Sequence, residues 1–260
     1  MIKILFAGDV VGRPARKFLQ DNLARLRTEQ KLDVIIVNGE NAASGSGLTK
    51  DTANDIFAAG ADIITTGDHI FKRKESKEVL ETMDVIRPLN QSAFAPGKGF
   101  MVKTIKGIKI GVINLLGRVF MPPVDCPFAA AKNCVEALRK ETPIIIVDMH
   151  AEATSEKLAM GYFLAGKVSA VLGTHTHIPT ADERLINGTA YITDCGMTGS
   201  FDSILGRDKA AIIEKFVTNL PVKFNLAQND VRLQGVIIEI NEQTGQALKI
   251  ERLEIKEGVK

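Results

Sequence analysis

The sequence predicts an α/β protein built around a largely parallel β-sheet. Short, continuous apolar runs, several of them ended by glycine, alternate with longer segments whose apolar residues recur at helical spacing. Such runs are too short for helices and are typical of strands that are buried on both faces, with helices packed on the sheet. A second observation is that all four histidines follow apolar runs, where α/β proteins place their chemistry.

The first section of the chain repeats one strand–helix unit. Residues 2–8 are a buried strand, and residues 14–30 are a helix that Pro14 opens and whose leucines share one face. The units that follow are strand 33–39, helix 50–60, strand 61–67 and helix 72–83. This order predicts parallel strands joined by helical crossovers.

The rest of the chain combines further units with hairpins. Residues 100–116 form a hairpin around a Lys-Gly turn, and a second hairpin at 183–193 has Asn187-Gly188 at its turn. Between them lie helix 127–140, strand 143–150, helix 153–166 and strand 168–175; a third hairpin spans 232–255. We expect one domain over residues 1–260, with a parallel or mixed core sheet and a strand-rich carboxyl-terminal sheet.

The composition is that of a soluble globular protein. The apolar content is 45%, the charged content is 25%, and no stretch approaches the ~20 apolar residues of a membrane span. The net charge of +2 gives a weak field, which implies no long nucleic-acid polymer but leaves an RNA partner open. Three cysteines without CxxC spacing indicate reduced thiols. We therefore expect a cytoplasmic protein without a membrane partner; its oligomeric state, including a homo-oligomer, stays open.

Polar residues that can bind metal gather at the ends of the predicted strands. They comprise oxygen donors and imidazoles, namely Asp9, Glu40, Asn41, Asp68, His150, His175 and His177. Mixed oxygen and nitrogen donors suit Mn, Fe, Zn or Co rather than a cysteine-rich structural zinc. The number of donors suits two ions that share a carboxylate, and such a pair, roughly 3.5–4 Å apart, can clamp a phosphoryl group.

Each of these residues has an ordinary explanation when it is considered alone. Asp9 could cap a helix or occupy a turn, Asn41 could be a turn residue, and His150 could be a core histidine bonded to the backbone. The ordinary explanation must account for each placement separately, whereas one metal site accounts for all of them. The combination therefore favours the metal site.

The order of these motifs resembles that of the calcineurin-like metallophosphoesterases. GD near the amino terminus is followed by NGEN, GDH, a histidine and GTHTH. Within that class, NGENAA, RPLN, NLLGR, DMHAEATSEK, GTHTHIPTAD and TDCGMTGSFDSILG resemble the YmdB-like bacterial phosphodiesterases over nearly the whole chain. The resemblance implies a sandwich of two mixed β-sheets flanked by helices. It also implies a dinuclear metal centre that hydrolyses small nucleotide phosphodiesters, including 2′,3′-cyclic nucleotides.

The resemblance also implies a role for each site residue. One ion would be held by Asp9, Glu40, Asn41 and His177, and the other by Glu40, Asp68, His150 and His175. A hydroxide between the ions would be the nucleophile, and His69 would donate a proton to the leaving ribose oxygen. Two divalent or mixed-valence ions are implied; Fe and Mn are favoured, and Zn, Co and Mg are compatible with the donors.

Val11 stands where the first calcineurin-like motif usually has histidine, and NGEN stands where the second usually has GD; both details narrow the resemblance to the YmdB-like group. From that group the chain departs at two places: Asp68 replaces an asparagine, and IFKRKES replaces the TWD continuation after His69. Asp68 adds a negative charge beside the second ion, which we expect to tighten metal binding and to weaken the attraction for an anionic diester.

Two other functions are compatible with parts of the sequence. The first is a metal-binding regulatory or RNA-associated protein with weak residual hydrolysis, which Asp68 keeps open. The second is a nucleotide-cofactor oxidoreductase, but the GxGxxG fingerprint of that class is missing. Gly45 and Gly47 lie in a segment that we expect to be a flexible loop beside the site.

Overall fold

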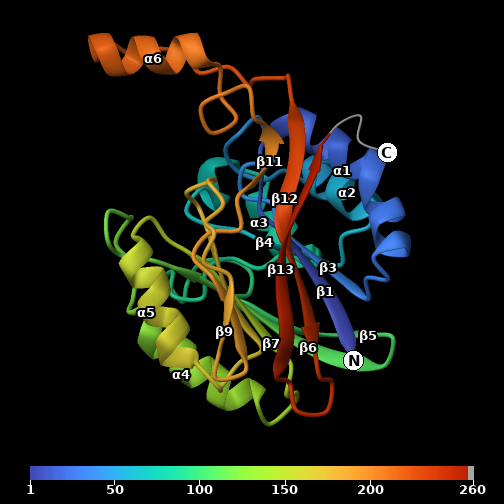
Figure 1. Cartoon of the computed structure of the whole chain (residues 1–260). Coiled ribbons are helices and arrows are strands. Elements are labelled where there is room, and N and C mark those ends of the chain that lie inside the picture. The colour runs from blue at the N-terminus through green and yellow to red at the C-terminus, as the bar shows by residue number, and fades with distance from the viewer. Residues whose placement is uncertain (257–260) are drawn as a thin grey trace.

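Two mixed β-sheets pack face to face, and helices lie on their outer sides (Figure 1). The computed structural model describes residues 1–256. The seven-stranded sheet has the order β2-β11-β12-β1-β3-β4, with β13 beside β12, and the six-stranded sheet has the order β5-β6-β7-β8-β10-β9. The sandwich of two mixed sheets that the resemblance implies is confirmed.

The predicted amino-terminal units build the centre of the seven-stranded sheet. The elements are β1 (Ile2–Ala7), β2 (Asp9–Val10), α1 (Gly12–Glu29), β3 (Val34–Asn38), α2 (Lys50–Ala58), β4 (Ile63–Thr65), the 3₁₀ turn η1 (Ile70–Lys72) and α3 (Ser76–Thr82). Strands β1, β3 and β4 are parallel neighbours, so their carboxyl ends meet at one edge of the sheet. Helix α2 begins with a capping box in which Thr49 and Thr52 bond each other's backbone.

The six-stranded sheet takes up the middle of the chain. Its elements are β5 (Phe100–Ile105), β6 (Ile108–Leu116), α4 (Pro127–Leu138), β7 (Ile145–His150), α5 (Thr154–Leu164), β8 (Ala170–Thr174), β9 (Arg184–Ile186) and β10 (Thr189–Ile192). Strands β6, β7 and β8 are parallel, and the hairpins β5–β6 and β9–β10 form as predicted. The carboxyl ends of β7 and β8 therefore also meet at one edge.

The expected separate carboxyl-terminal sheet does not form. Strands β11 (Met197–Ser200), β12 (Val231–Ile240) and β13 (Ala247–Lys256) join the seven-stranded sheet, where β12 pairs antiparallel with β1. Strand β10 instead pairs with β8 of the other sheet. The sequence pattern of a hairpin predicts only that its own two strands pair with each other. Which sheet the hairpin joins depends on the open edge of β1, with which β12 pairs.

Helix α6 (Lys209–Thr218) is not predicted by the apolar pattern. It projects from the body of the molecule (Figure 1), and Ile212 is its one buried residue. Asp208 caps its first turn by accepting from the Ala211 N–H, and Asn219 ends it in a left-handed conformation. The ends of this helix are set by local capping, and the helix has no amphipathic face. A search for apolar periodicity therefore misses it.

Alternating side chains fill three apolar layers. Ile4 of β1 and Ile36 of β3 face Ile146 of β7 between the sheets. The opposite faces pack against α1 and α2 on one side, and against α4 and α5 on the other. Both faces of the central strands are thus buried, which explains their uninterrupted apolar sequences.

All three cysteines, Cys126, Cys134 and Cys195, are free thiols, as their spacing predicts. Burial raises the pKa of Cys134 to about 12. Among residues 1–256, no helix is both long enough and apolar enough to cross a membrane.

We predict that Gly161→Ala destabilises the protein, although alanine is normally better than glycine within a helix by roughly 0.5–1 kcal/mol. A Cβ at position 161 of α5 would lie 2.5 Å from Cδ2 of the buried Tyr191 ring. We expect urea denaturation to give a free energy of unfolding lower by about 1–3 kcal/mol, as for other overpacked cores. The exposed control Ala159→Gly on the same helix should cost only its helix propensity. A Gly161→Ala protein as stable as the parent would contradict this packing.

Candidate metal centre

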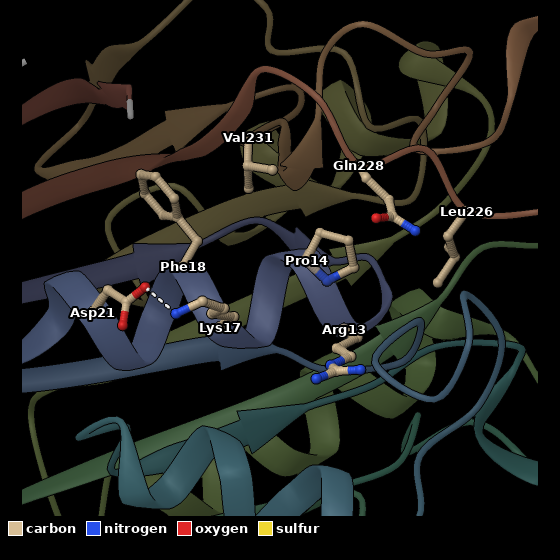
Figure 2. A pocket seen from close by; sticks show the side chains of 8 residues that line it. All are labelled: Arg13, Pro14, Lys17, Phe18, Asp21, Leu226, Gln228 and Val231. Carbon is tan, nitrogen blue, oxygen red and sulfur yellow. Dashed lines mark hydrogen bonds and ion pairs between the residues drawn. The ribbon is translucent and has the colours of Figure 1, made fainter. Parts of the chain in front are cut away.

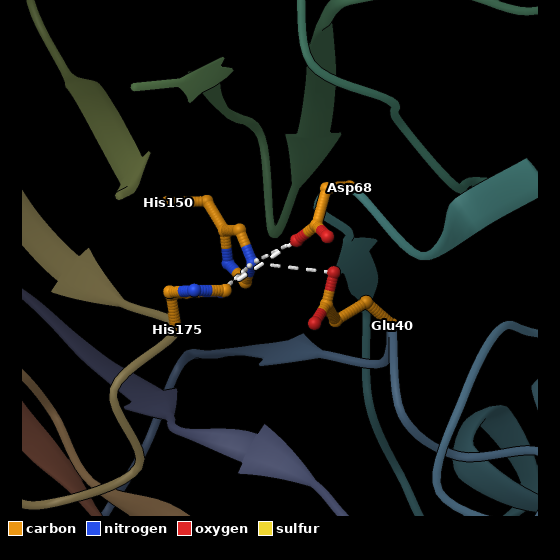
Figure 3. A group of neighbouring side chains, drawn as sticks. All are labelled: Glu40, Asp68, His150 and His175. Carbon is orange, nitrogen blue, oxygen red and sulfur yellow. Dashed lines mark hydrogen bonds and ion pairs between the residues drawn. The ribbon is translucent and has the colours of Figure 1, made fainter. Parts of the chain in front are cut away.

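Four predicted ligands from four strand ends converge on one point. Glu40 follows β3, Asp68 follows β4, His150 ends β7 and His175 follows β8. Each offers one ligand atom, and the four atoms lie within 4.8 Å of one another (Figure 3). Two carboxylates from one sheet therefore face two imidazoles from the other.

His150 is at the centre of this cluster and is fully buried. Its Nε2 lies 3.2 Å from Glu40 Oε2 and 3.4 Å from Asp68 Oδ1. Dashed lines mark both contacts in Figure 3. His175 Nδ1 is 3.0 Å from the same nitrogen and 3.5 Å from Asp68 Oδ1. Each of these contacts joins an imidazole nitrogen to a carboxylate oxygen or to another imidazole nitrogen. All of these atoms carry lone pairs and can act as metal ligands.

The hydrogen bonds behind His150 direct one lone pair at the cluster. The Thr174 hydroxyl donates to Asp148 Oδ1 at 2.6 Å, so its oxygen is left to accept from His150 Nδ1 at 2.8 Å. A proton on Nδ1 leaves Nε2 as a bare acceptor. That acceptor faces carboxylate oxygens, an arrangement that a proton or a cation between them stabilises.

Asp9 and His177 adjoin the four-residue cluster. Asp9 Oδ1 lies 3.9 Å from both His150 Nδ1 and His177 Nε2, and Asp9 Oδ2 accepts from the His175 N–H at 3.1 Å. The predicted residues at the ends of β1 and β8 are therefore brought to the same place.

Asn41 is oriented differently from the other predicted ligands. Its Nδ2 donates to Glu40 Oε1 at 2.9 Å and lies 3.2 Å from His177 Nε2. Its Oδ1 faces His69 Nδ1 at 2.8 Å. The amide nitrogen faces these two groups because an uncompensated carboxylate attracts an N–H donor.

The donor set fits metal ions. Asp9 Oδ1 and Asp68 Oδ1 are buried and have no hydrogen-bond partner within the described part of the chain. Burial raises the pKa of Asp9 to about 7, against the opposing charge of a protonated His150. For Glu40, burial is outweighed by a proton on His150, which holds the pKa well below its usual value, so the pair stabilises a positive charge between its members. Buried carboxylates that lack partners are stabilised by a cation.

His69 lies at the edge of the cluster rather than within it. Its side chain is 32% exposed, with Nδ1 3.3 Å from Glu40 Oε1 and Nε2 3.6 Å from Asp68 Oδ2. The hydrogen bond with Glu40 raises the pKa of His69 above its ordinary value, with a smaller contribution from the Asp68 charge. The imidazolium is therefore favoured here, as a proton donor requires.

A buried ion pair that the sequence analysis assigned no role supports the GTHTH loop. Lys157 of α5 lies 2.7 Å from Asp194, and neither side chain is exposed. Asp194 also accepts from the backbone N–H of Thr176, between the two loop histidines, at 3.1 Å. His175 and His177 have φ values of 95° and 64°, which cost free energy in non-glycine residues, so the loop needs such support. The position of a lysine on the buried face of a predicted helix could have indicated this ion pair from the sequence.

The glycine-containing loop after Asn41 is held by three arginines. Arg16 donates to the Ala42 carbonyl, Arg73 donates to Ala43 and Ser46, and Arg207 donates to Ser44 and Gly45. Five consecutive carbonyls are thus bonded by side chains from distant parts of the chain. The backbone of the loop is therefore satisfied by arginines that no local sequence pattern connects to it.

A cavity of about 320 Å³ opens onto the cluster. Its lining includes Glu40, Asn41, His69, Glu152, His175, His177 and Arg207. A larger cavity of about 460 Å³ lies between α1 and residues 226–231 (Figure 2). None of the predicted site residues lines the larger cavity, where Lys17 pairs with Asp21 at 3.0 Å. The smaller, histidine-rich cavity is therefore the candidate site.

The two-sheet sandwich is also the fold of a putative 5′-nucleotidase from Staphylococcus aureus, with a TM-score of 0.64 at 13% identity, covering 97% of this chain and 54% of that one. The sequence model of the YmdB-like protein family matches residues 5–253, and the chain belongs to that family. It is 47% identical over 258 residues to the 2′,3′-cyclic-nucleotide 2′-phosphodiesterase of Bacillus subtilis, covering 98% of both chains.

Two solved structures are similar over nearly their whole length. The structure of a hypothetical protein from Thermus thermophilus has a TM-score of 0.92 at 38% identity, covering 98% of this chain and 99% of that one. A structure described as a novel phosphatase from Mycoplasma pneumoniae has a TM-score of 0.92 at 36% identity, covering 98% and 93%.

We predict that Gly67→Ala weakens metal binding roughly 10- to 100-fold, as disturbing the supports of metal ligands does elsewhere. A Cβ at this position would lie 2.2 Å from both Glu40 Oε2 and His150 Nε2, the two atoms that meet at the centre of the cluster. Elemental analysis and metal titration would measure the change, with circular dichroism to verify the fold. Gly111→Ala is the matched control, because its nearest neighbour is a Leu138 methyl at 3.3 Å. Parent-like metal affinity in Gly67→Ala would contradict the central position of these atoms.

Proposed function

We propose that the chain is a single-domain, metal-dependent phosphodiesterase that hydrolyses small nucleotide diesters such as 2′,3′-cyclic nucleotides. The observation that carries the proposal is the buried cluster of Glu40, Asp68, His150 and His175, in which lone pairs face one another. The name of the B. subtilis relative, 2′,3′-cyclic-nucleotide 2′-phosphodiesterase, supports the choice of substrate.

The residues divide into two overlapping ligand sets. One ion would be held by Glu40, Asp68, His150 and His175, and the other by Asp9, Glu40, Asn41 and His177. When bound, the ions supply Lewis-acid charge and lower the pKa of a water molecule so that it can attack phosphorus. Glu40 belongs to both sets because its two oxygens face different neighbours, His150 on one side and Asn41 on the other. Mixed carboxylate and imidazole donors suit Mn, Fe, Zn or Co, and among these the resemblance to the family favours Fe or Mn.

His69 would deliver a proton to the leaving ribose oxygen. The residue lines the cavity that opens onto the cluster, and its backbone N–H donates to Glu40 Oε2 at 3.2 Å. That bond holds the residue in place, while its partly exposed ring remains accessible from the cavity. The neighbouring carboxylates favour the protonated form that donates.

The proposed activity requires metal. We expect the purified protein with added Mn²⁺ to hydrolyse 2′,3′-cyclic AMP to a single nucleoside monophosphate, as followed by ³¹P NMR. EDTA should abolish turnover, and fresh Mn²⁺ should restore it, since the cluster alone provides no Lewis acid. If the metal-replete protein hydrolyses neither cyclic nor linear diesters, the proposed function is wrong.

The role of His69 depends on the leaving group. With 2′,3′-cyclic AMP, His69→Ala should lower kcat by roughly 10²–10⁴-fold, the usual contribution of a positioned proton donor. With bis-p-nitrophenyl phosphate the loss should be much smaller, because p-nitrophenolate leaves without a proton. Metal content measured in the same samples separates proton donation from metal loss. Equal losses of kcat with both substrates at full metal content would contradict the assignment of His69 as the proton donor.

A further inference from the structure

A second cavity adjoins the metal cluster on the Asp68 side. It has a volume of about 270 Å³, and its lining residues are Asp68, Phe71, Gln91, Ser92, Ala95, Leu116, Pro122, Pro123 and Val124. His69 lines the first cavity, and its Nε2 lies 3.6 Å from Asp68 Oδ2, so neighbouring side chains line the two cavities. A ligand that reaches both cavities would pass the reacting centre.

The two cavities differ in chemistry. The first contains two glutamates, an arginine and three histidines, which suit phosphate and ribose. In the second, Asp68 is the only charged residue, and Phe71, Leu116 and the Pro122-Pro123 pair provide apolar surface. Phe71 is 43% exposed, which leaves part of its ring available to a ligand. Proline has a fixed φ, so this wall loses little freedom when a ligand binds.

One polar atom in the second cavity has no partner. Gln91 Oε1 is buried and accepts no hydrogen bond from any residue in the described range 1–256. An orphaned acceptor of this kind costs free energy unless a ligand supplies a donor. The edge of every nucleobase carries N–H donors, and its faces stack on aromatic rings.

The connectivity of the substrate places a base close to the reacting phosphorus. In a 2′,3′-cyclic nucleotide the base is attached at C1′, one carbon from the carbon that bears the 2′-oxygen. A pocket next to the proton donor is therefore where a base would lie. Drug-sized ligands occupy roughly 300–1,000 Å³, so this slightly smaller cavity suits a single planar ring system.

We propose that this second cavity is a nucleobase subsite, in which Phe71 stacks on the base and the Gln91 carboxamide accepts a hydrogen bond from its edge. The proposal rests on the proposed function. It assigns a specificity role to residues 71 and 91, which come from η1 and from the segment before β5.

The test compares a substrate that has a base with one that lacks it. For each variant we would measure kcat/KM for 2′,3′-cyclic AMP and for methyl riboside 2′,3′-cyclic phosphate. Phe71→Ala should lower the ratio of the two values by roughly 5- to 150-fold, the equivalent of one lost base–aromatic stack. Gln91→Leu should lower it by roughly 2- to 12-fold, the equivalent of one hydrogen bond.

Controls separate this proposal from the function on which it rests. Phe216→Ala removes an exposed phenylalanine of α6 that does not line the cavity, and it should leave the ratio unchanged. If the parent hydrolyses both substrates and the Phe71 and Gln91 variants keep its ratio, the subsite is wrong and the function stands. If the parent hydrolyses neither substrate, calorimetric titration of the metal-free protein with 3′-AMP tests the subsite independently of turnover. Binding that Phe71→Ala weakens would support the subsite, and binding that this variant leaves unchanged would overturn it.

Discussion

A hydrogen bond between Asn38 and Asp148 ties the two sheets together beside the metal cluster. Asn38 ends β3 in one sheet, and its Nδ2 lies 2.9 Å from Asp148 Oδ2 of β7 in the other. Both residues are fully buried, so neither can lose its partner without a substantial cost in free energy. Asn38 is two residues before Glu40 and Asp148 is two residues before His150, so this bond sets the distance across which carboxylate and imidazole meet.

The sequence predicts the elements of the fold better than their assembly. Buried strands and their helices are evident from uninterrupted apolar runs, because strands covered on both faces contain few polar residues. The assignment of β12 and β13 to the first sheet could not be predicted. The alternation of apolar and polar residues in these strands indicates a hairpin, but it does not indicate with which sheet edge the hairpin pairs. Helix α6 was missed because one buried side chain gives no periodic signal.

The candidate site was predictable because parallel strands bring their carboxyl ends together. Residue type and position beside a strand were enough to nominate Glu40, Asp68, His150 and His175, which the structure brings within reach of one ion. The supports of the site were not predictable in the same way. Asp148 and Lys157 stand out only as charges at buried positions, and their partners Thr174 and Asp194 are remote in sequence. The same holds for the arginines that fix the loop after Asn41.

The order in which the chain supplies the site has a consequence for biosynthesis. A ribosome releases the amino-terminal half first, so Asp9, Glu40 and Asp68 are available well before His175, whose backbone bonds Asp9 across 166 positions. The carboxylates gain their imidazole partners only when most of the polypeptide has been translated. Strand β12, which covers the open edge of β1, arrives later still. The four-residue cluster is therefore complete only after β8 has been translated, and a nascent chain stalled before β8 would present the carboxylates without His175.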